Sequence, residues 1–220
     1  MMEDLASDAC VGGLAQVKTS RADKREKTRK SLLQAAIEIV GEEGYAAASI
    51  SRITSRANVA LGTFYNYFDN QQSLFGQLLP FMDDQLTAHI RAEVSDSSAS
   101  AAFDRAHFIA YVEFCRKTPA FLRVLDEAKV FAPEIYRRYV TTMLEGYLRA
   151  LERSVSKQET LSFTSEKLPS IAIVLMGIRH YAAMLHQHRY MEHSALSLEA
   201  MADIYEKFLM CGILNDKQSN

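Results

Sequence analysis

The apolar residues of this chain recur at three- and four-residue steps along most of its length, which is the period of an amphipathic α-helix. Strand-like alternation, internal repeats and a glycine-rich phosphate loop are not visible in the sequence. Pro119 and Pro133 suit the first turns of helices, and serine-rich breaks separate the periodic segments. We therefore predict an all-α fold, with later helices over roughly residues 70–94, 101–117, 119–130, 133–154, 165–188 and 196–214.

The segment Ser49–Phe68 contains two short amphipathic patterns on either side of a polar break. In the first pattern Ile50 and Ile53 have helical spacing, and the Ser49 hydroxyl is placed to cap the opening turn. Asn58 follows, and asparagine tolerates left-handed backbone geometry. The sequence thus predicts a sharp turn between two short helices.

The second pattern begins near Ala60. Leu61, Phe64 and Phe68 recur at three- and four-residue steps and are candidates for burial. Gly62 costs about 1 kcal/mol relative to alanine inside a helix, which suggests close approach of the backbone to a phosphate chain. The polar side chains left facing outward are Thr63, Tyr65, Asn66 and Tyr67. This layout presents a helix to DNA, although paired aromatics and a helix-turn-helix also occur as plain packing.

A basic segment precedes these helices. Between Lys18 and Lys30 seven basic residues oppose only Asp23 and Glu26, which is the electrostatic footprint expected of a phosphate-binding protein. From Lys18 to Phe68 nine Lys and Arg oppose five Asp and Glu, a local charge of +4, whereas the whole chain carries −2. A solvated charged helix face is the alternative interpretation. The next helix has an apolar face formed by Leu32, Leu33, Ala35, Ala36, Ile39 and Val40.

Residues Thr28–Phe75 resemble the amino-terminal domain of the TetR family of bacterial transcriptional regulators. The positions that carry the resemblance are Thr28, Arg29, Ala35, Ala36, Gly44, Ala57, Val59, Gly62, Thr63, Phe64, Tyr65, Tyr67, Phe68, Ser73 and Leu74. The resemblance implies a helical homodimer whose third helix, here Ala60–Phe68, enters the major groove of DNA. It implies an amino-terminal DNA-binding domain and a larger carboxy-terminal domain for effector binding and dimerisation.

Carried over position by position, the resemblance implies a set of DNA-facing residues: Ser49, Ser51, Arg52, Leu61, Gly62, Thr63, Tyr65, Asn66, Tyr67 and Gln71. The three hydroxyl-bearing side chains of the third helix are expected on phosphates, whereas Arg52 and Asn66 have the geometry to recognise base edges. The family often has Ser-Lys at Ala60-Leu61 and Lys at Gln71. Without those lysines, either the basic segment supplies the attraction to phosphates or the affinity for DNA is modest. Leu61 instead has the apolar surface to touch a thymine methyl group.

The predicted organisation comprises an arm over residues 1–20, a DNA-binding domain over 21–75, an effector-binding and dimerisation domain over 76–215, and a tail over 216–220. The three cysteines, Cys10, Cys115 and Cys211, are widely spaced and suggest a reducing compartment. No signal peptide is visible, and the longest apolar run, Ile171–Ile178, is too short for a membrane span. We expect a cytoplasmic bacterial protein that associates with the nucleoid when bound to DNA.

The helix over about Ser170–Gln187 has two apolar faces. The first contains Ile171, Val174, Leu175, Ile178, Ala182 and Leu185, and the second contains Ile173, Met176, Gly177, His180 and Met184. A helix that is apolar all round must be covered on both sides, by its own domain and by a partner subunit. We expect the last helix to join that interface through Leu198, Met201, Ala202, Tyr205, Phe208 and Leu209. The resemblance likewise implies a four-helix dimer interface, and burial in a monomeric bundle is the alternative.

The middle helices are rich in aromatic residues and are expected to form the effector pocket. Candidate pocket residues are His107, Tyr111, Phe114, Phe121, Tyr136, Tyr139, Met143, Met176, Arg179 and His180. Further candidates are Phe103, Phe108, Cys115, Leu125, Phe131 and Tyr147. Such a composition is usual for a small-molecule site, but aromatics also fill ordinary cores. An aromatic or acyl effector is expected, and an acidic or phenolic group would pair with Arg179 or His180.

An enzyme is not expected. His180, His186, His188 and His193 lie close in sequence, but no Cys or carboxylate stands at metal-ligand spacing and no nucleophile and base are paired, so neither a metal nor a cofactor is predicted. The function expected is that of a repressor which binds a palindromic operator as a dimer and is released by a small molecule. The alternatives are a ligand-independent or architectural DNA-binding protein and, further away, a helical-bundle enzyme.

Overall fold

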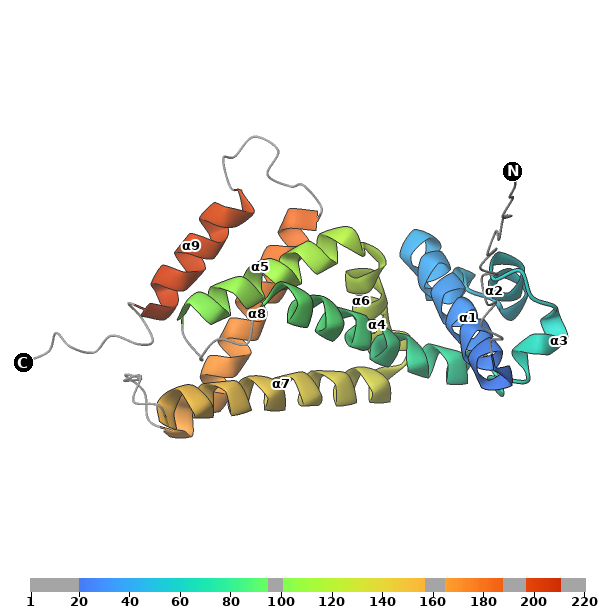
Figure 1. Cartoon of the computed structure of the whole chain (residues 1–220), viewed down its shortest axis with the longest axis horizontal. Helices are drawn as coiled ribbons and strands as arrows, with labels where there is room; N and C mark the ends of the chain where they lie inside the picture. The colour runs from blue at the N-terminus through green and yellow to red at the C-terminus, as the bar shows by residue number, and fades with distance from the viewer. Residues whose placement is uncertain (1–19, 95–100, 157–164, 188–196, 211–220) are drawn as a thin grey trace, which may run out of the picture.

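The computed structural model describes residues 20–94, 101–156, 165–187 and 197–210. These residues form helices throughout and contain no strand, so the predicted all-α fold is confirmed (Figure 1). In chain order the elements are α1 (Arg21–Glu43), η1 (Tyr45–Ala47), α2 (Ile50–Arg56), α3 (Leu61–Phe64), α4 (Gln71–Glu93), α5 (Ala101–Lys117), α6 (Ala120–Phe131), α7 (Pro133–Ser156), η2 (Ser165–Lys167), α8 (Leu168–Gln187) and α9 (Leu198–Phe208).

Side-chain caps fix where several helices begin. The Ser20 hydroxyl accepts a hydrogen bond from the amide of Asp23, and the Asp23 carboxylate accepts one from the amide of Ser20. Ser20 therefore starts α1, and the part of the predicted basic segment that follows it belongs to the first turns of this helix. Asn70 and Ser73 cap α4 in the same reciprocal way. The predicted arm up to residue 19 and the tail over 216–220 lie outside the described residues.

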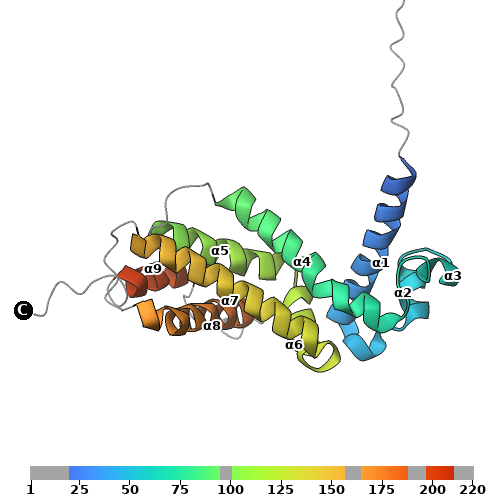
Figure 2. The same cartoon turned by 90° about the horizontal axis from the view of Figure 1, so that it is seen from below.

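Helices α1 to α3 form a compact head at one end of the molecule, and α5 to α9 form a larger body (Figures 1 and 2). The apolar face predicted for the first helix is buried in the head together with Ile53, Phe64 and Phe68. Helix α4 begins against α1 and continues into the body, where it packs on α5, α6 and α7. The boundary that we expected after Phe75 therefore falls inside one continuous helix, which couples the head to the body.

A polar junction joins α6 to the end of α1. The Arg123 guanidinium donates to the backbone oxygens of Gly41 and Glu42, at 3.2 and 2.9 Å. The Glu127 carboxylate accepts from Arg123 at 2.9 Å and from the backbone amide of Tyr45 at 2.7 Å. These contacts satisfy carbonyl groups that the end of a helix leaves unpaired. The head and body are thus held by specific hydrogen bonds as well as by apolar packing.

The faces of α8 differ from those that we predicted. Its inner stripe consists of Leu168, Ile171, Ala172, Leu175, Arg179 and Ala183. Ile173, Val174 and Tyr181 are exposed. The prediction that Val174 shares a face with Ile171 and Leu175 was therefore wrong. Residues 173, 174, 177 and 181 follow the helical repeat along the opposite side, and hydrophobicity alone did not distinguish the two sides.

The assignment of α9 also requires correction. Ala202, Tyr205 and Leu209, which we expected at a partner subunit, are buried within their own chain. Tyr205 stacks on Phe108 of α5, with ring centroids 4.7 Å apart. Phe208, which we also predicted at the interface, is exposed, and it is joined by Ile204 and Met210, which we did not predict.

Helix α8 is long and apolar enough to cross a bilayer when judged by length and composition alone. The uninterrupted apolar run in the sequence, residues 171–178, is shorter than a span because Arg179 and His180 follow it. One such helix is weak support for a membrane span, because core helices meet the same criteria. Since α8 packs against α5 and α7 and carries Arg179 on its inner side, we interpret it as a core helix of the body.

Candidate nucleic-acid interface

The turn between α2 and α3 has the geometry predicted for it. The Ser49 hydroxyl accepts a hydrogen bond from the amide of Arg52 and caps α2. Asn58 has a φ of 55°, in the left-handed region, and is the only described residue other than glycine with a positive φ. The chain reverses there and the Val59 amide donates to the Thr54 carbonyl at 3.0 Å. These local contacts hold α3 at a fixed angle to α2.

The α-helical part of α3 is shorter than predicted, since it covers Leu61–Phe64 rather than the whole of Ala60–Phe68. Helical turns nevertheless continue beyond it, because the amides of Asn66 and Tyr67 donate to the carbonyls of Thr63 and Phe64. Phe64 and Phe68 are buried and pack on one another with ring centroids 5.5 Å apart. Their burial orients the rest of the segment away from the head.

Most of the predicted DNA-facing side chains on α3 and on the helical turns that follow it, over residues 61–67, are exposed together. Leu61 and Tyr65 are 54% and 57% exposed, Asn66 is exposed, and Thr63 and Tyr67 are half-buried. The suggestion that Leu61 belongs to the core was wrong, because it begins α3 on the outer side of the helix. A Cβ atom at Gly62 would meet no atom of the described residues within 4 Å. Internal packing therefore does not explain the glycine.

Three of the predicted residues that flank this segment, Ser49, Arg52 and Gln71, have partners within the protein. Arg52 forms an ion pair with Glu43 and donates to the Ala47 carbonyl at 3.2 Å. The Gln71 amide donates to the Ala48 carbonyl at 3.0 Å. Ser49 is engaged as a cap, whereas Ser51 is exposed. Hydrogen bonding from Arg52 lowers the pKa of the Glu43 carboxyl, so this pair is fully charged at neutral pH. An exposed ion pair of this kind is weak and can be exchanged for a phosphate.

A basic stripe on α1 borders the same surface, and the sequence analysis did not resolve it into individual residues. Arg21, Lys24, Arg25 and Thr28 line a hollow with Asn66 and Tyr67. Arg25 donates to the backbone oxygen of Asn66 at 3.5 Å, and its guanidinium lies 5.9 Å from the centre of the Tyr67 ring. The spacing of the four α1 residues, at steps of three and four, places them on one helix face and was a usable signal.

The stripe carries unpaired positive charge next to α3. Arg21, Lys24 and Arg25 form no ion pair with any carboxylate in the described part of the chain, whereas Arg29 and Arg56 are paired with glutamates of α1. A hydroxyl-rich helix beside cations that lack counter-ions matches the chemistry of a phosphate chain. The described geometry therefore fits the backbone of a nucleic acid better than a small ligand.

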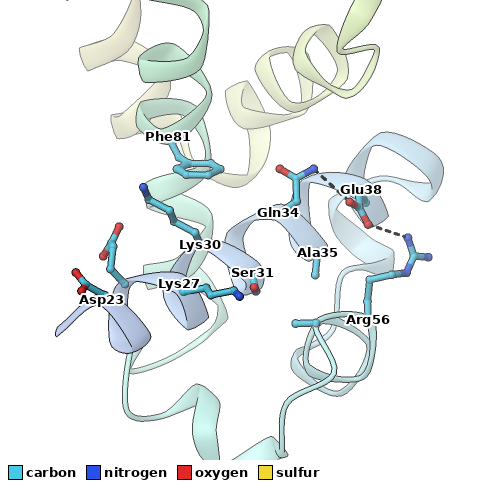
Figure 3. A pocket seen from close by; sticks show the side chains of 11 residues that line it. Asp23, Lys27, Lys30, Ser31, Gln34, Ala35, Glu38, Arg56 and Phe81 are labelled. Atoms are coloured by element: carbon cyan, nitrogen blue, oxygen red, sulfur yellow. Dashed lines mark hydrogen bonds and ion pairs between the residues drawn. The ribbon is translucent and has the colours of Figure 1, made fainter. Parts of the chain in front are cut away.

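A second hollow lies between α1, α2 and α4 (Figure 3). It contains Lys27, Lys30 and Arg56, but also Asp23, Glu26 and Glu38. Glu38 accepts from Gln34 at 3.2 Å and lies 3.6 Å from Arg56, as the dashed lines in Figure 3 show. Because positive and negative groups alternate and pair there, the hollow has no net preference for an anion.

The body contains a cavity of about 320 Å³ that includes some of the predicted effector residues. His107, Met143 and Arg179 line it, together with Phe108 and Tyr147 from the wider set. The predicted residues that do not line it are Tyr111, Phe114, Phe121, Tyr136, Tyr139, Met176 and His180. Tyr111, Phe114, Phe121 and Tyr139 are buried in the hydrophobic core.

Other polar groups near the body core have internal partners. His180 is half-buried, and its Nδ1 lies 3.4 Å from the Tyr111 hydroxyl. Burial lowers the pKa of His180 and raises that of the Cys115 thiol to about 12, which makes this buried cysteine unreactive. No cluster of three His, Cys, Asp or Glu suited to a metal occurs among the described residues, while His188 and His193 lie outside them.

Comparison with known proteins matches residues 32–78 to the family described as bacterial regulatory proteins, tetR family. Among curated relatives, the nucleoid occlusion factor SlmA of Actinobacillus pleuropneumoniae is 24% identical over 127 residues, or 55% of this chain and 63% of that protein. The HTH-type transcriptional regulator YvdT of Bacillus subtilis is 42% identical over 60 residues, or 27% and 29% of the two chains. The match thus spans less than two thirds of the length of these relatives.

Solved structures extend the likeness to the whole fold. The fatty acid degradation regulator FadR from Bacillus halodurans has a TM-score of 0.66 at 18% identity, over 88% of this chain and 97% of that one. The ketosteroid transcriptional regulator KstR2 of Mycobacterium tuberculosis has a TM-score of 0.59 at 17% identity, over 86% and 95%. The helix-turn-helix lies within the residues that match the tetR family, and the helical body shares the fold of these solved regulators. Residues 32–78 are thus similar to the amino-terminal domain of the TetR family of bacterial regulatory proteins.

Proposed function

We propose that this protein is a DNA-binding transcriptional regulator that binds a palindromic operator as a homodimer. The observation that carries the proposal is the exposed surface of α3, with Gly62, Tyr65 and Asn66 outward and the basic stripe of α1 beside it. A helix inserted in the major groove needs small residues where its backbone meets the DNA and donors at its edges. This surface supplies both.

Individual roles follow from the chemistry of each side chain. The hydroxyls of Thr63, Tyr65 and Tyr67 donate to phosphates, and the Asn66 amide is suited to the paired donor and acceptor of adenine. Arg25 stands beside Tyr67 and supplies charge where the family often has lysines. Arg52 contacts DNA by exchanging Glu43 for a phosphate or a base edge. Gln71 acts indirectly in this proposal, by holding the Ala48 carbonyl.

Dimerisation through the last two long helices is supported by their exposed apolar side chains. Ile173, Val174 and Tyr181 on α8 and Ile204 and Phe208 on α9 are each at least 45% exposed. Both helices pack on α5 within the body, so their outer sides are available to a second copy. A dimer places two α3 helices about 34 Å apart, as successive major grooves of a palindrome require.

Repression and release by a small molecule complete the proposal. Repression is the usual mode of the family, and the cavity in the body offers room for an effector. The name of one similar protein, a fatty acid degradation regulator, supports an acyl ligand, and that of another, a ketosteroid transcriptional regulator, supports a largely apolar one. Binding that favours one spacing of the two heads over another shifts the population away from the DNA-bound form.

Selection of DNA by the purified full chain tests the proposal. Random duplexes retained by the protein are sequenced, and the enriched site is then footprinted. We expect a short palindrome with two protected half-sites, and the site can be located next to the genes that it controls. Absence of any retained DNA at low salt would overturn the proposal.

The similarity to nucleoid occlusion factors favours a second candidate, a nucleoid-associated DNA-binding protein that needs no effector. Broad, salt-sensitive protection without a defined palindrome would support an architectural protein of this kind. A defined palindrome with no response to any small molecule would support the ligand-independent regulator.

A further inference from the structure

Arg179 is a buried cation that forms no ion pair with a carboxylate of the described residues. It lies on the inner side of α8 and is only 7% exposed. Its guanidinium carbon lies 4.2 Å from the centre of the Tyr111 ring and 4.8 Å from that of the Tyr147 ring. None of the ion pairs in the described part of the chain includes Arg179. The guanidinium is therefore held between two aromatic faces rather than beside a carboxylate.

In this arrangement the desolvation cost of the guanidinium is only partly compensated. Taking a guanidinium out of water is unfavourable, and the π faces of tyrosine offset only part of the loss. Arginine cannot relieve the strain by releasing its proton, because its pKa is too high. An anion placed against the free edge of the guanidinium would restore the missing interaction in a medium where charges attract strongly.

Arg179 also forms part of the wall of the cavity in the body. Phe108, Met143 and Tyr147 provide apolar surface in the same wall. A volume of about 320 Å³ equals roughly ten water molecules at about 30 Å³ each, which suits a small ligand. Nearby, the Tyr139 hydroxyl is buried and has no hydrogen-bond partner within the described residues. Burial raises the pKa of this hydroxyl, the charge of Asp83 adds to the rise, and the charge of Arg179 opposes it.

Two carboxylates limit the charge that the cavity can accept. Asp83 and Asp104 line it together with Arg179. Burial raises the pKa of Asp83, which shows that this position already disfavours negative charge. A ligand with one carboxylate can place it on Arg179 and keep its hydrocarbon part near the aspartates. A dianion or a phosphate ester would bring a second negative charge toward them.

We infer that the cavity binds a small amphipathic monocarboxylic acid, whose carboxylate accepts hydrogen bonds from Arg179 while its hydrocarbon part packs on Phe108 and Met143. The inference rests on the proposed effector-responsive function, and it specifies the chemical class of the effector and the residue that recognises it.

Matched pairs of probes test the class of ligand on the unaltered full chain. Titration calorimetry compares octanoate with octanamide and phenylacetate with phenylacetamide, and it includes the dicarboxylate octanedioate. We expect at least one acid to bind at least tenfold more tightly than its amide, and octanedioate to bind more weakly than octanoate. Equal affinity for acid and amide, binding of none of the probes, or preference for the dicarboxylate would overturn the inference.

Substitution tests the residue. Arg179→Met keeps an unbranched apolar stem and removes the guanidinium with its charge, and we expect the preference for acid over amide to disappear. Arg137→Met, on the exposed start of α7, should keep the full preference. If Arg179→Met does not fold, Arg179→Lys retains the charge without the planar fork and should reduce the preference severalfold. An unchanged preference in either folded variant would contradict the assignment.

Retardation of operator DNA by the unliganded protein is measured separately. Acid binding without DNA binding would sustain the role of Arg179 and remove the proposed regulator. DNA binding without any preference for an acid would sustain the proposed regulator and remove the role of Arg179.

Discussion

The head and the body place polar and apolar side chains in opposite ways. In the head, Phe64 and Phe68 are buried while Tyr65 and Asn66 face outward. In the body, apolar residues of α8 and α9 are exposed and Arg179 is buried. The head therefore satisfies its own apolar groups and offers polar ones, which suits a surface that meets water or DNA. The body has an exposed apolar surface, which a second copy of the chain would cover, and a buried charge, which an anionic ligand would neutralise.

Two arginines show the same contrast at the level of single residues. Arg52 is exposed and forms an ion pair with Glu43, so its partner is readily exchanged. Arg179 has no carboxylate partner among the described residues and is shielded from water by tyrosines. Arg52 can therefore exchange one anionic partner for another, whereas Arg179 favours the binding of an anion that supplies the missing partner.

The largest expected effect concerns the exposed apolar side chains of the body. Ile173→Glu combined with Ile204→Glu should give a monomer, because charge on both helices opposes their burial against a second copy. Operator affinity should fall by about 10²–10⁴-fold, as one half-site no longer assists the other. Light scattering and gel retardation measure the two effects. Glutamate at Val130, an exposed apolar residue of α6, is the matched control and should leave a dimer.

An intact dimer with normal operator affinity in the double variant would show that another surface joins the subunits. The contrast between the two regions would then be lost, because the exposed residues of α8 and α9 would have no partner to explain them.

The sequence predicted the head more accurately than the body for a physical reason. Ser49, Asn58, Phe64 and Phe68 act through contacts within a few residues, so their spacing predicts their roles. The faces of α8 depend on which helices pack against it, and its apolar residues surround it on all sides, so Val174 was misassigned.

The hydrogen-bond partners of the polar side chains could not be predicted from the sequence either. Glu127 meets the amide of Tyr45 and Gln71 meets the carbonyl of Ala48, across 82 and 23 positions. No periodicity reports such contacts. One signal was present in the sequence, because the basic residues of α1 beside α3 recur at steps of three and four.

The next effect concerns the junction between the two regions. Glu127→Ala leaves the Tyr45 amide and the Arg123 guanidinium without their acceptor, so the free energy of unfolding should fall by about 1–3 kcal/mol. Denaturant titration measures it. Glu134→Ala removes an exposed pair with Arg137 and should stay within about 0.5 kcal/mol of the parent. Equal losses in the two variants would mean that the junction is no more than surface pairing.

A smaller effect separates function from stability in the head. Tyr65→Phe removes one hydroxyl from α3, and operator affinity should fall about tenfold if that hydroxyl donates to a phosphate. Melting temperature should not change, because the ring remains. Tyr181→Phe is the matched control, since Tyr181 is 59% exposed against 57% for Tyr65 and lies on α8. Unchanged retardation of the operator by the Tyr65 variant would remove this contact.

The smallest effect has opposite signs for stability and for binding. At Gly62 an added Cβ meets no atom within 4 Å in the part of the chain that the structure describes, so Gly62→Ala should stabilise the head by about 0.5–1 kcal/mol through helix propensity. If α3 lies against the DNA backbone, the same methyl group should weaken operator binding severalfold. Gly146→Ala on α7 adds a Cβ no closer than 4.0 Å to a side-chain nitrogen, and should stabilise without affecting DNA.

A variant at Gly62 that is both more stable and equally tight on DNA would place the glycine outside the interface. The packing of the described residues does not require a glycine at position 62, so an external partner is the explanation tested. Comparing the stability and the DNA affinity of Gly62→Ala tests the contact of α3 with DNA without disturbing an internal contact. Thermal melting measures the change in stability, and gel retardation on the same preparation measures the change in operator affinity.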